Sequence, residues 1–259
     1  MRQDCQDNKD RVTLLLSGNA AGFELKPPLI YHSQNPRSMK HVRKSALPVY
    51  YRHNRKAWMT LSLFDDWFQN CFVPETKEYC RRKGIQFKIL LLLDSAPTHP
   101  RYISDVHPDV KVIYLPPSTT ALIQPMDQGA IGAFKAHCLR RKFAQTLGAL
   151  ESGETLREFW KRYNILHAVQ NMSAAWKNVP QNCMRGIWKQ ALKTSADAVD
   201  DFDKDSAIDR IVSDKILWLG HALQLDIRKD EIRGLINARS ERRKNYAYGN
   251  EQIHGEKTS

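Results

Sequence analysis

The feature that most constrains the fold is a short apolar run that ends on a carboxylate. Residues 89–93 are all aliphatic and lead directly into Asp94. A run of this length, bounded by Gly84 and Pro97, is typical of a strand at the centre of a sheet that helices cover on both faces. We therefore predict a doubly buried strand over residues 87–93, with Asp94 at its end.

The flanking elements place this strand in an α/β fold. Residues 110–115 predict a second strand, which Pro116 and Pro117 end. Residues 62–72 predict an amphipathic helix that starts with a capping box over 62–65, with Asp in place of Glu, and Pro74 should break or restart it before a stop at Gly84. The alternation of strand and helix implies a sheet with right-handed crossovers. The buried face of this helix should consist of Phe64, Trp67, Phe68, Cys71 and Phe72.

The start of the chain predicts a hairpin behind a polar leader. Residues 1–10 are almost wholly polar and cannot form a buried strand without burying several charges. Residues 11–17 and 25–32 read as strands joined by a turn over 18–22, and the Pro27-Pro28 pair should push the second strand to an edge of the sheet.

A second carboxylate begins a later helix. Residues 127–147 predict a long helix headed by Asp127, which lies 33 positions (127 minus 94) after Asp94. Carboxylates at a strand end and at a helix start can converge on divalent metal ions, for which oxygen ligands are suited. The alternative is structural: Asp94 would be a turn former and Asp127 a helix N-cap.

The charge balance favours a polyanionic partner. The chain has 40 Lys and Arg against 28 Asp and Glu, a net charge of +12, and a pI near 9.5. Basic surface attracts phosphate and releases counterions, so nucleic acid is the expected ligand; a cationic surface that only keeps the protein soluble is the alternative. The candidate phosphate ligands are Arg37, Lys40, Arg43, Lys44, Arg140 and Arg141. The first four lie in an irregular segment, 33–56. The alternative interpretation of this segment is a solvated loop that binds no ligand.

The remainder of the sequence predicts one domain with a helical extension. Residues 11–150 form the main body, 151–195 continue it as helices, 196–207 are an acidic linker, and 208–259 are a basic helical tail with a disordered end. The five cysteines are scattered without a C-x-x-C pair. With no apolar run near the roughly 20 residues that span a bilayer and no signal-peptide core, we expect an intracellular protein without membrane contact.

Two long motifs resemble a known family. The stretches LLLDSAPTHP (91–100) and LPPSTTALIQPMDQG (115–129) closely resemble the DDE superfamily endonuclease domain of pogo/Tigger-type transposases and their jerky and centromere-protein-B-like relatives. Residues 9–13 and 57–60 resemble further blocks of that family. The resemblance implies an RNase H-like fold, dependence on Mg²⁺ or Mn²⁺, cleavage and transfer of DNA strands, and a nuclear location.

The same resemblance assigns roles to individual residues. Asp94 matches the family's second catalytic, metal-binding aspartate, and Asp127 matches the third. His99 lies near Asp94 and is either a contact to the nucleic acid or a loop histidine with no catalytic duty.

The sequence also departs from the family pattern. The first catalytic aspartate and its strand should precede residues 9–13, and so should a helix-turn-helix DNA-binding region, so we expect an N-terminally truncated chain with an incomplete RNase H-like sheet. We expect it to be catalytically dead alone. Two rivals follow: a non-enzymatic DNA-binding or chromatin-associated protein, and an interaction module whose open sheet edge takes a second copy or another protein.

Overall fold

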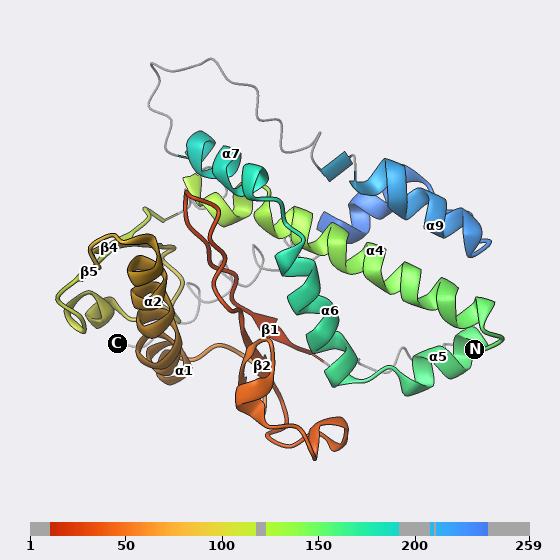
Figure 1. The fold of residues 1–259 in the computed structure, drawn as a ribbon, viewed down its shortest axis with the longest axis horizontal. Helices are drawn as coiled ribbons and strands as arrows, with labels where there is room; N and C mark the ends of the chain where they lie inside the picture. The colour runs from red at the N-terminus through yellow and green to blue at the C-terminus, as the bar shows by residue number, and fades with distance from the viewer. Residues whose placement is uncertain (1–10, 118–122, 192–207, 210, 238–259) are drawn as a thin grey trace, which may run out of the picture.

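The computed structural model describes residues 11–117, 123–191, 208–209 and 211–237. Within these ranges two small sheets are combined with many helices, which confirms the predicted α/β class. Figure 1 shows the hairpin of β1 (Thr13–Leu14) and β2 (Pro28–Tyr31) near the middle of the molecule. On one side lie α1 (Leu61–Trp67) and α2 (Val73–Lys83) beside β4 (Ile89–Leu93) and β5 (Val110–Tyr114), and on the other lies the long helix α4 (Ala130–Glu151). The predicted acidic linker and the end of the tail lie outside the described residues.

The hairpin forms as predicted, but its second strand is central. The strands β1 (Thr13–Leu14) and β2 (Pro28–Tyr31) are antiparallel, and β3 (Tyr50–His53) pairs with β2 in parallel to give the order β1-β2-β3. The edge placement expected from the two prolines is therefore wrong. A proline lacks only its N–H, and here the carbonyls still accept hydrogen bonds: Pro28 from Leu15 and Pro27 from Tyr50.

The aromatic helix forms, with a different start and no break. Helix α1 (Leu61–Trp67) begins at the N-cap Thr60, whose hydroxyl accepts a hydrogen bond from the Leu63 N–H, so the expected capping box is wrong. A π-helical turn, η3 (Phe68–Phe72), leads into α2 (Val73–Lys83), with its proline in the first turn. The wider turn accommodates this proline, so the helix continues to Gly84, where φ is 64°. All five predicted aromatic and cysteine positions are buried.

The central apolar run is a strand with one covered face. Strand β4 (Ile89–Leu93) pairs in parallel with β5 (Val110–Tyr114). Leu93 and Val110 belong to the core cluster that Phe64, Trp67 and Phe68 complete. Leu90, by contrast, is 57% exposed, so the prediction of burial on both faces is wrong for the described residues.

The second half of the described chain is helical. Helix α4 crosses the molecule and packs against α6, α7 and α9 (Figure 1). The indole N–H of Trp176 on α6 donates to the Leu25 carbonyl at 3.1 Å, which ties these helices to the hairpin. The bounds are η5 (Pro125–Gln128), α4 (Ala130–Glu151), α5 (Leu156–Arg162), α6 (Ile165–Lys177), α7 (Gln181–Ala191), η6 (Val212–Ile216) and α9 (Leu217–Ala222). No helix in the described ranges is long and apolar enough to cross a membrane.

Candidate functional site

Asp94 occupies the carboxyl end of the parallel pair β4–β5. Its Oδ1 lies 2.7 Å from Nδ1 of His99, and it also accepts a hydrogen bond from the Ala96 N–H at 3.1 Å. The bond to Ala96 makes a local turn, so the turn-forming role considered for Asp94 is present in the structure. The side chain remains 22% exposed, and solvent can therefore reach this carboxylate.

The loop that follows Asp94 is held from two sides. The His99 ring lies 4.8 Å from the Phe64 ring of α1, and its side chain is only 9% exposed. The Tyr114 hydroxyl of β5 donates to the Pro100 carbonyl at 2.5 Å. This geometry gives His99 a positioning role on Asp94 that sequence spacing did not identify, because histidine five residues after aspartate has no fixed meaning in a loop.

Asp127 lies on η5, a short turn that packs against α4 and α7. Gly129, with φ of 134°, separates this turn from α4 and is itself the N-cap of that helix. The prediction of one helix starting at Asp127 is therefore wrong, and so is the alternative in which Asp127 is the N-cap of that helix. Asp127 is exposed, whereas its neighbour Met126 is buried in the core formed with α4, α6 and α7.

The residues next to the two carboxylates thus belong to different hydrophobic core clusters. Leu93, next to Asp94, packs with α1, and Met126, next to Asp127, packs with α7. Within the described ranges no group of three or more His, Cys, Asp or Glu side chains could hold a metal ion. Carboxylate oxygens are the right ligand type for Mg²⁺ or Mn²⁺, and Mg²⁺ is usually held by one or two carboxylates together with waters and substrate phosphates. The convergence of Asp94 with Asp127 stays a prediction.

The first basic segment presents three of its four predicted cations to solvent. Arg37 and Lys40 lie at η1 (Arg37–Met39), and Arg43 precedes η2 (Lys44–Ala46); all three are exposed. Lys44 is half-buried, and its Nζ donates to the Met39 carbonyl at 3.3 Å.

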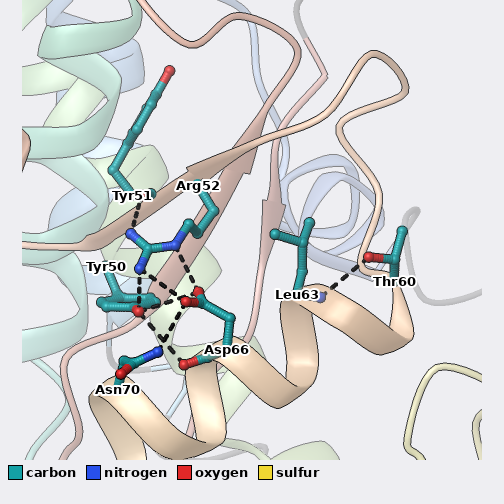
Figure 2. Close-up of polar contacts among 7 residues, drawn as sticks. All are labelled: Tyr50, Tyr51, Arg52, Thr60, Leu63, Asp66 and Asn70. Carbon is teal, nitrogen blue, oxygen red and sulfur yellow. Dashed lines mark hydrogen bonds and ion pairs between the residues drawn. The ribbon is translucent and has the colours of Figure 1, made fainter.

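The two tyrosines of this segment make contacts within the fold: Tyr51 is buried, and Tyr50 joins a hydrogen-bonded group with Arg52 and Asp66. Arg52 on β3 makes an ion pair with Asp66 on α1, with 2.6 Å between Nε and Oδ2, and lies 3.9 Å from the Tyr50 ring (Figure 2). The Tyr50 hydroxyl accepts from Arg52 and donates to Asp66, which also accepts from Asn70. Burial, partly offset by Arg52, raises the pKa of Tyr50 to about 12. The segment is therefore not a wholly solvated loop, and Arg52 is engaged with Asp66.

Arg140 and Arg141, which lie far along the sequence from the first basic segment, line a groove. The groove lies between α4 and the η6–α9 segment, has a volume of about 380 Å³, and includes Lys215 and Trp218. Sequence reasoning missed these last two residues because more than 70 positions (215 minus 141 is 74) separate them from the arginines. His137, one turn before Arg141 on α4, is buried, and burial together with the charges of Arg140 and Lys215 lowers its pKa to about 4.

Comparison with known proteins gives a single family. The sequence model for the DDE superfamily endonuclease matches residues 9–188. The human Jerky protein homolog is 35% identical over 188 residues, which cover 71% of this chain and 32% of that protein. Human Tigger transposable element-derived protein 7 is 34% identical over 71% of this chain and 36% of its own length. ARS-binding protein 1 of Schizosaccharomyces pombe is 30% identical over 65% of this chain and 32% of its own length.

These matches are consistent in extent and in kind. The chain spans about a third of the length of the curated relatives it matches. No solved structure matches. The matched range contains both carboxylates, the hairpin and the helices up to α7. The chain belongs to the DDE superfamily endonuclease family.

Proposed function

We propose that this chain is a transposase-derived endonuclease-like domain that binds DNA and does not cleave it when isolated. The observation that carries the proposal is Asp94, a solvent-accessible carboxylate fixed at the end of a parallel strand inside the range that matches the family. Relatives whose names include "transposable element-derived" and "ARS-binding" support a role on DNA. A nuclear location follows from that role.

The proposed metal ligands are Asp94 and Asp127. A divalent ion bound there would supply a Lewis acid for phosphodiester chemistry. His99 and the Ala96 N–H hold Oδ1 of Asp94 in place, so the orientation of this ligand does not depend on the ion. No group of three or more acidic, cysteine or histidine side chains in the described residues could hold a metal ion, so we propose that this set is too small for efficient two-metal catalysis.

The proposed DNA-binding surface is the basic segment around η1 and η2. Arg37, Lys40 and Arg43 are exposed, and the net charge of +12 provides attraction for the phosphate backbone. Contacts of this kind position a protein on a duplex without reading its sequence. We therefore expect binding to duplexes of any sequence that weakens as salt rises.

The test combines binding with cleavage. Fluorescence anisotropy with a labelled 20-base-pair duplex should show binding whose affinity falls between 50 and 200 mM salt, and the triple variant Arg37→Ala/Lys40→Ala/Arg43→Ala should bind several-fold more weakly. Lys83→Ala, an exposed cation at the far end of α2, is a single-site control for non-specific loss of charge. Supercoiled plasmid should remain intact in Mg²⁺ or Mn²⁺. Nicking that disappears in Asp94→Asn would show that the chain is an active nuclease, and absence of duplex binding would overturn the DNA-binding role.

A second candidate function is strand addition at the edge of β4 that no described strand covers. The sheets β1-β2-β3 and β4-β5 share no hydrogen-bonded strand among the described residues. Ile89 donates its N–H toward β5, at the Asp109 carbonyl, so the backbone groups of Leu90 and Leu92 face away from β5. Leu90 is also 57% exposed, which leaves apolar surface beside that edge. We propose a second copy of the chain as the occupant.

Proline provides a selective test of this edge. Leu90→Pro removes an N–H from the outer edge and leaves the ladder to β5 intact. Light scattering after size exclusion should show a dimer for the unmodified chain and a monomer for the variant, with unchanged circular dichroism. A monomer at all concentrations of the unmodified chain would exclude this candidate.

A further inference from the structure

The groove between α4 and α9 combines an exposed indole with three cations. Arg140 and Arg141 lie on one wall, and Lys215 and Trp218 lie on the other. Its volume, about 380 Å³, is within the roughly 300–1,000 Å³ typical of ligand sites. Trp218 is 64% exposed, the highest value among the large apolar side chains in the described ranges.

The exposure of Trp218 is not required for packing. The segment is anchored by Val212 and Ile216, which are fully buried with Ala136 of α4, and by Leu219, which is 6% exposed. Trp218 lies between Ile216 and Leu219 in the sequence and lines the groove instead. Removing the apolar surface of an indole from water lowers the free energy. A ligand that covers the Trp218 ring would therefore bind favourably.

No side chain that the structure describes neutralises the cations of the groove. Neither arginine nor Lys215 forms an ion pair with any described residue. The Nε of Arg141 is buried and finds no hydrogen-bond partner in the described part of the chain, which costs free energy that a bound phosphate drawing the guanidinium outward would recover. After burial, the charges of Arg140 and Lys215 are further causes of the lowered pKa of the neighbouring His137.

We propose that this groove binds single-stranded DNA, with one unstacked base on the Trp218 ring and the flanking phosphates on Arg140, Arg141 and Lys215. The inference rests on the proposed DNA binding and specifies that the DNA bound in this groove is single-stranded. Duplex DNA hides its base faces, so charge alone would suit a duplex, whereas an exposed ring beside the charges suits an unpaired base. A membrane surface fits less well, because the apolar face of α9 is already buried against α4 and only one ring projects.

The experiment compares single-stranded and duplex DNA on the full chain. Anisotropy with labelled oligo(dT) of 12 nucleotides should show a loss of about tenfold for Trp218→Ala and little change for Trp218→Phe, which keeps a stacking ring. Arg140→Ala and Lys215→Ala should each reduce the slope of log K against log salt by about 0.7. Affinity for the 20-base-pair duplex should change less than twofold in Trp218→Ala. The matched control is Trp160→Ala, because Trp160 is 48% exposed on α5 and packs on Phe159 and Tyr163.

Each outcome separates this inference from the proposed function. Binding to the duplex without any effect of Trp218→Ala on oligo(dT) would overturn the groove and leave the DNA-binding role intact. Oligo(dT) binding that depends on Trp218, without duplex binding, would support the groove and overturn the duplex-binding surface. Binding to neither DNA overturns both proposals. If the protein bound anionic vesicles but not oligo(dT), and vesicle binding depended on Trp218, the groove would be assigned to a membrane and the inference overturned. Oligo(dT) should also quench tryptophan fluorescence, and that quenching should shrink in Trp218→Phe, so the result does not depend on one variant.

Discussion

Nδ1 of His99 lies 2.7 Å from Oδ1 of Asp94, and this contact fixes the only sequence-predicted metal ligand that stands at a strand end. The four-residue loop between them is held by the contact of the tilted His99 and Phe64 rings and by the hydrogen bond from Tyr114 to the Pro100 carbonyl. The carboxylate is thereby oriented by α1 and β5 together. Asp94 is held in position by neighbouring side chains, whatever its part in chemistry.

His99→Ala should lower the free energy of unfolding by about 1–2 kcal/mol, because the variant loses a hydrogen bond to a carboxylate and the packing of a nearly buried ring. Urea unfolding followed by circular dichroism measures this change. Thr98→Ala, one position earlier in the loop, is the matched control and should stay within about 0.5 kcal/mol of the unmodified protein. Equal stability of all three proteins would show that the contact contributes nothing.

Asp66→Asn should destabilise the junction of β3 and α1 by about 1–2 kcal/mol at neutral pH, allowing for partial solvent screening of a pair that is about one-third exposed. Burial opposes the charge on Asp66, but the hydrogen bonds and charge of Arg52, with help from Asn70 and Tyr50, outweigh it and lower the pKa. A lowered folded pKa gives stability that is present above the ordinary value of 3.8 and is lost as pH falls through the folded value.

The loss caused by Asp66→Asn should therefore shrink as pH falls below about 4. Thermal unfolding from pH 3 to 8 provides the measurement, and a double-mutant cycle with Arg52→Ala isolates the pair. Additive losses in that cycle would contradict coupling between Arg52 and Asp66. Asp65→Asn is the control, since the Asp65 side chain accepts a hydrogen bond from Gln69 on an exposed face.

His137 should make the protein acid-sensitive in a defined window. Burial, with the charges of Arg140 and Lys215, lowers its pKa to about 4 from the usual 6.5. The stability associated with neutral His137 is present above pH 6.5 and is lost as pH falls through about 4. His137→Leu should remove about 2 kcal/mol of this acid-dependent loss between pH 7 and 4. The control is His221→Gln on the exposed side of α9, and a pH profile unchanged by His137→Leu would disprove the assignment.

Glu24 should act in the opposite direction. Its burial, only partly offset by Lys177, raises its pKa to about 7 from 4.5. The stability that protonated Glu24 contributes is complete below pH 4.5 and is lost as pH rises through about 7. Glu24→Gln should therefore stabilise the protein above pH 7 by about 1 kcal/mol, a value reduced for partial solvent exposure. Chemical unfolding at pH 5 and 8.5 measures the difference, with exposed Glu151→Gln as the control.

Local sequence determined the elements whose signals are short in range. The apolar run over 89–93 forms a strand because its residue types suit a pleated, half-buried surface. The aromatic stripe of α1 and η3 is buried because its spacing places it on one helical face. Gly84 ends α2 because glycine adopts a positive φ without steric cost. The long motifs around Asp94 and Asp127 identified the family, which the match over residues 9–188 confirms.

Tertiary structure decided what depends on partners distant in the chain. The centrality of β2 is set by hydrogen bonds to both neighbours, which its prolines do not prevent. The strand β3, inside what read as a basic loop, exists because β2 offers it a ladder and Asp66 offers Arg52 a partner. Trp218 meets Arg140 only because Ile216 buries itself against α4. Residue types and periodicity are local properties, whereas edges, grooves and ion pairs are made by contacts that only the folded chain brings together.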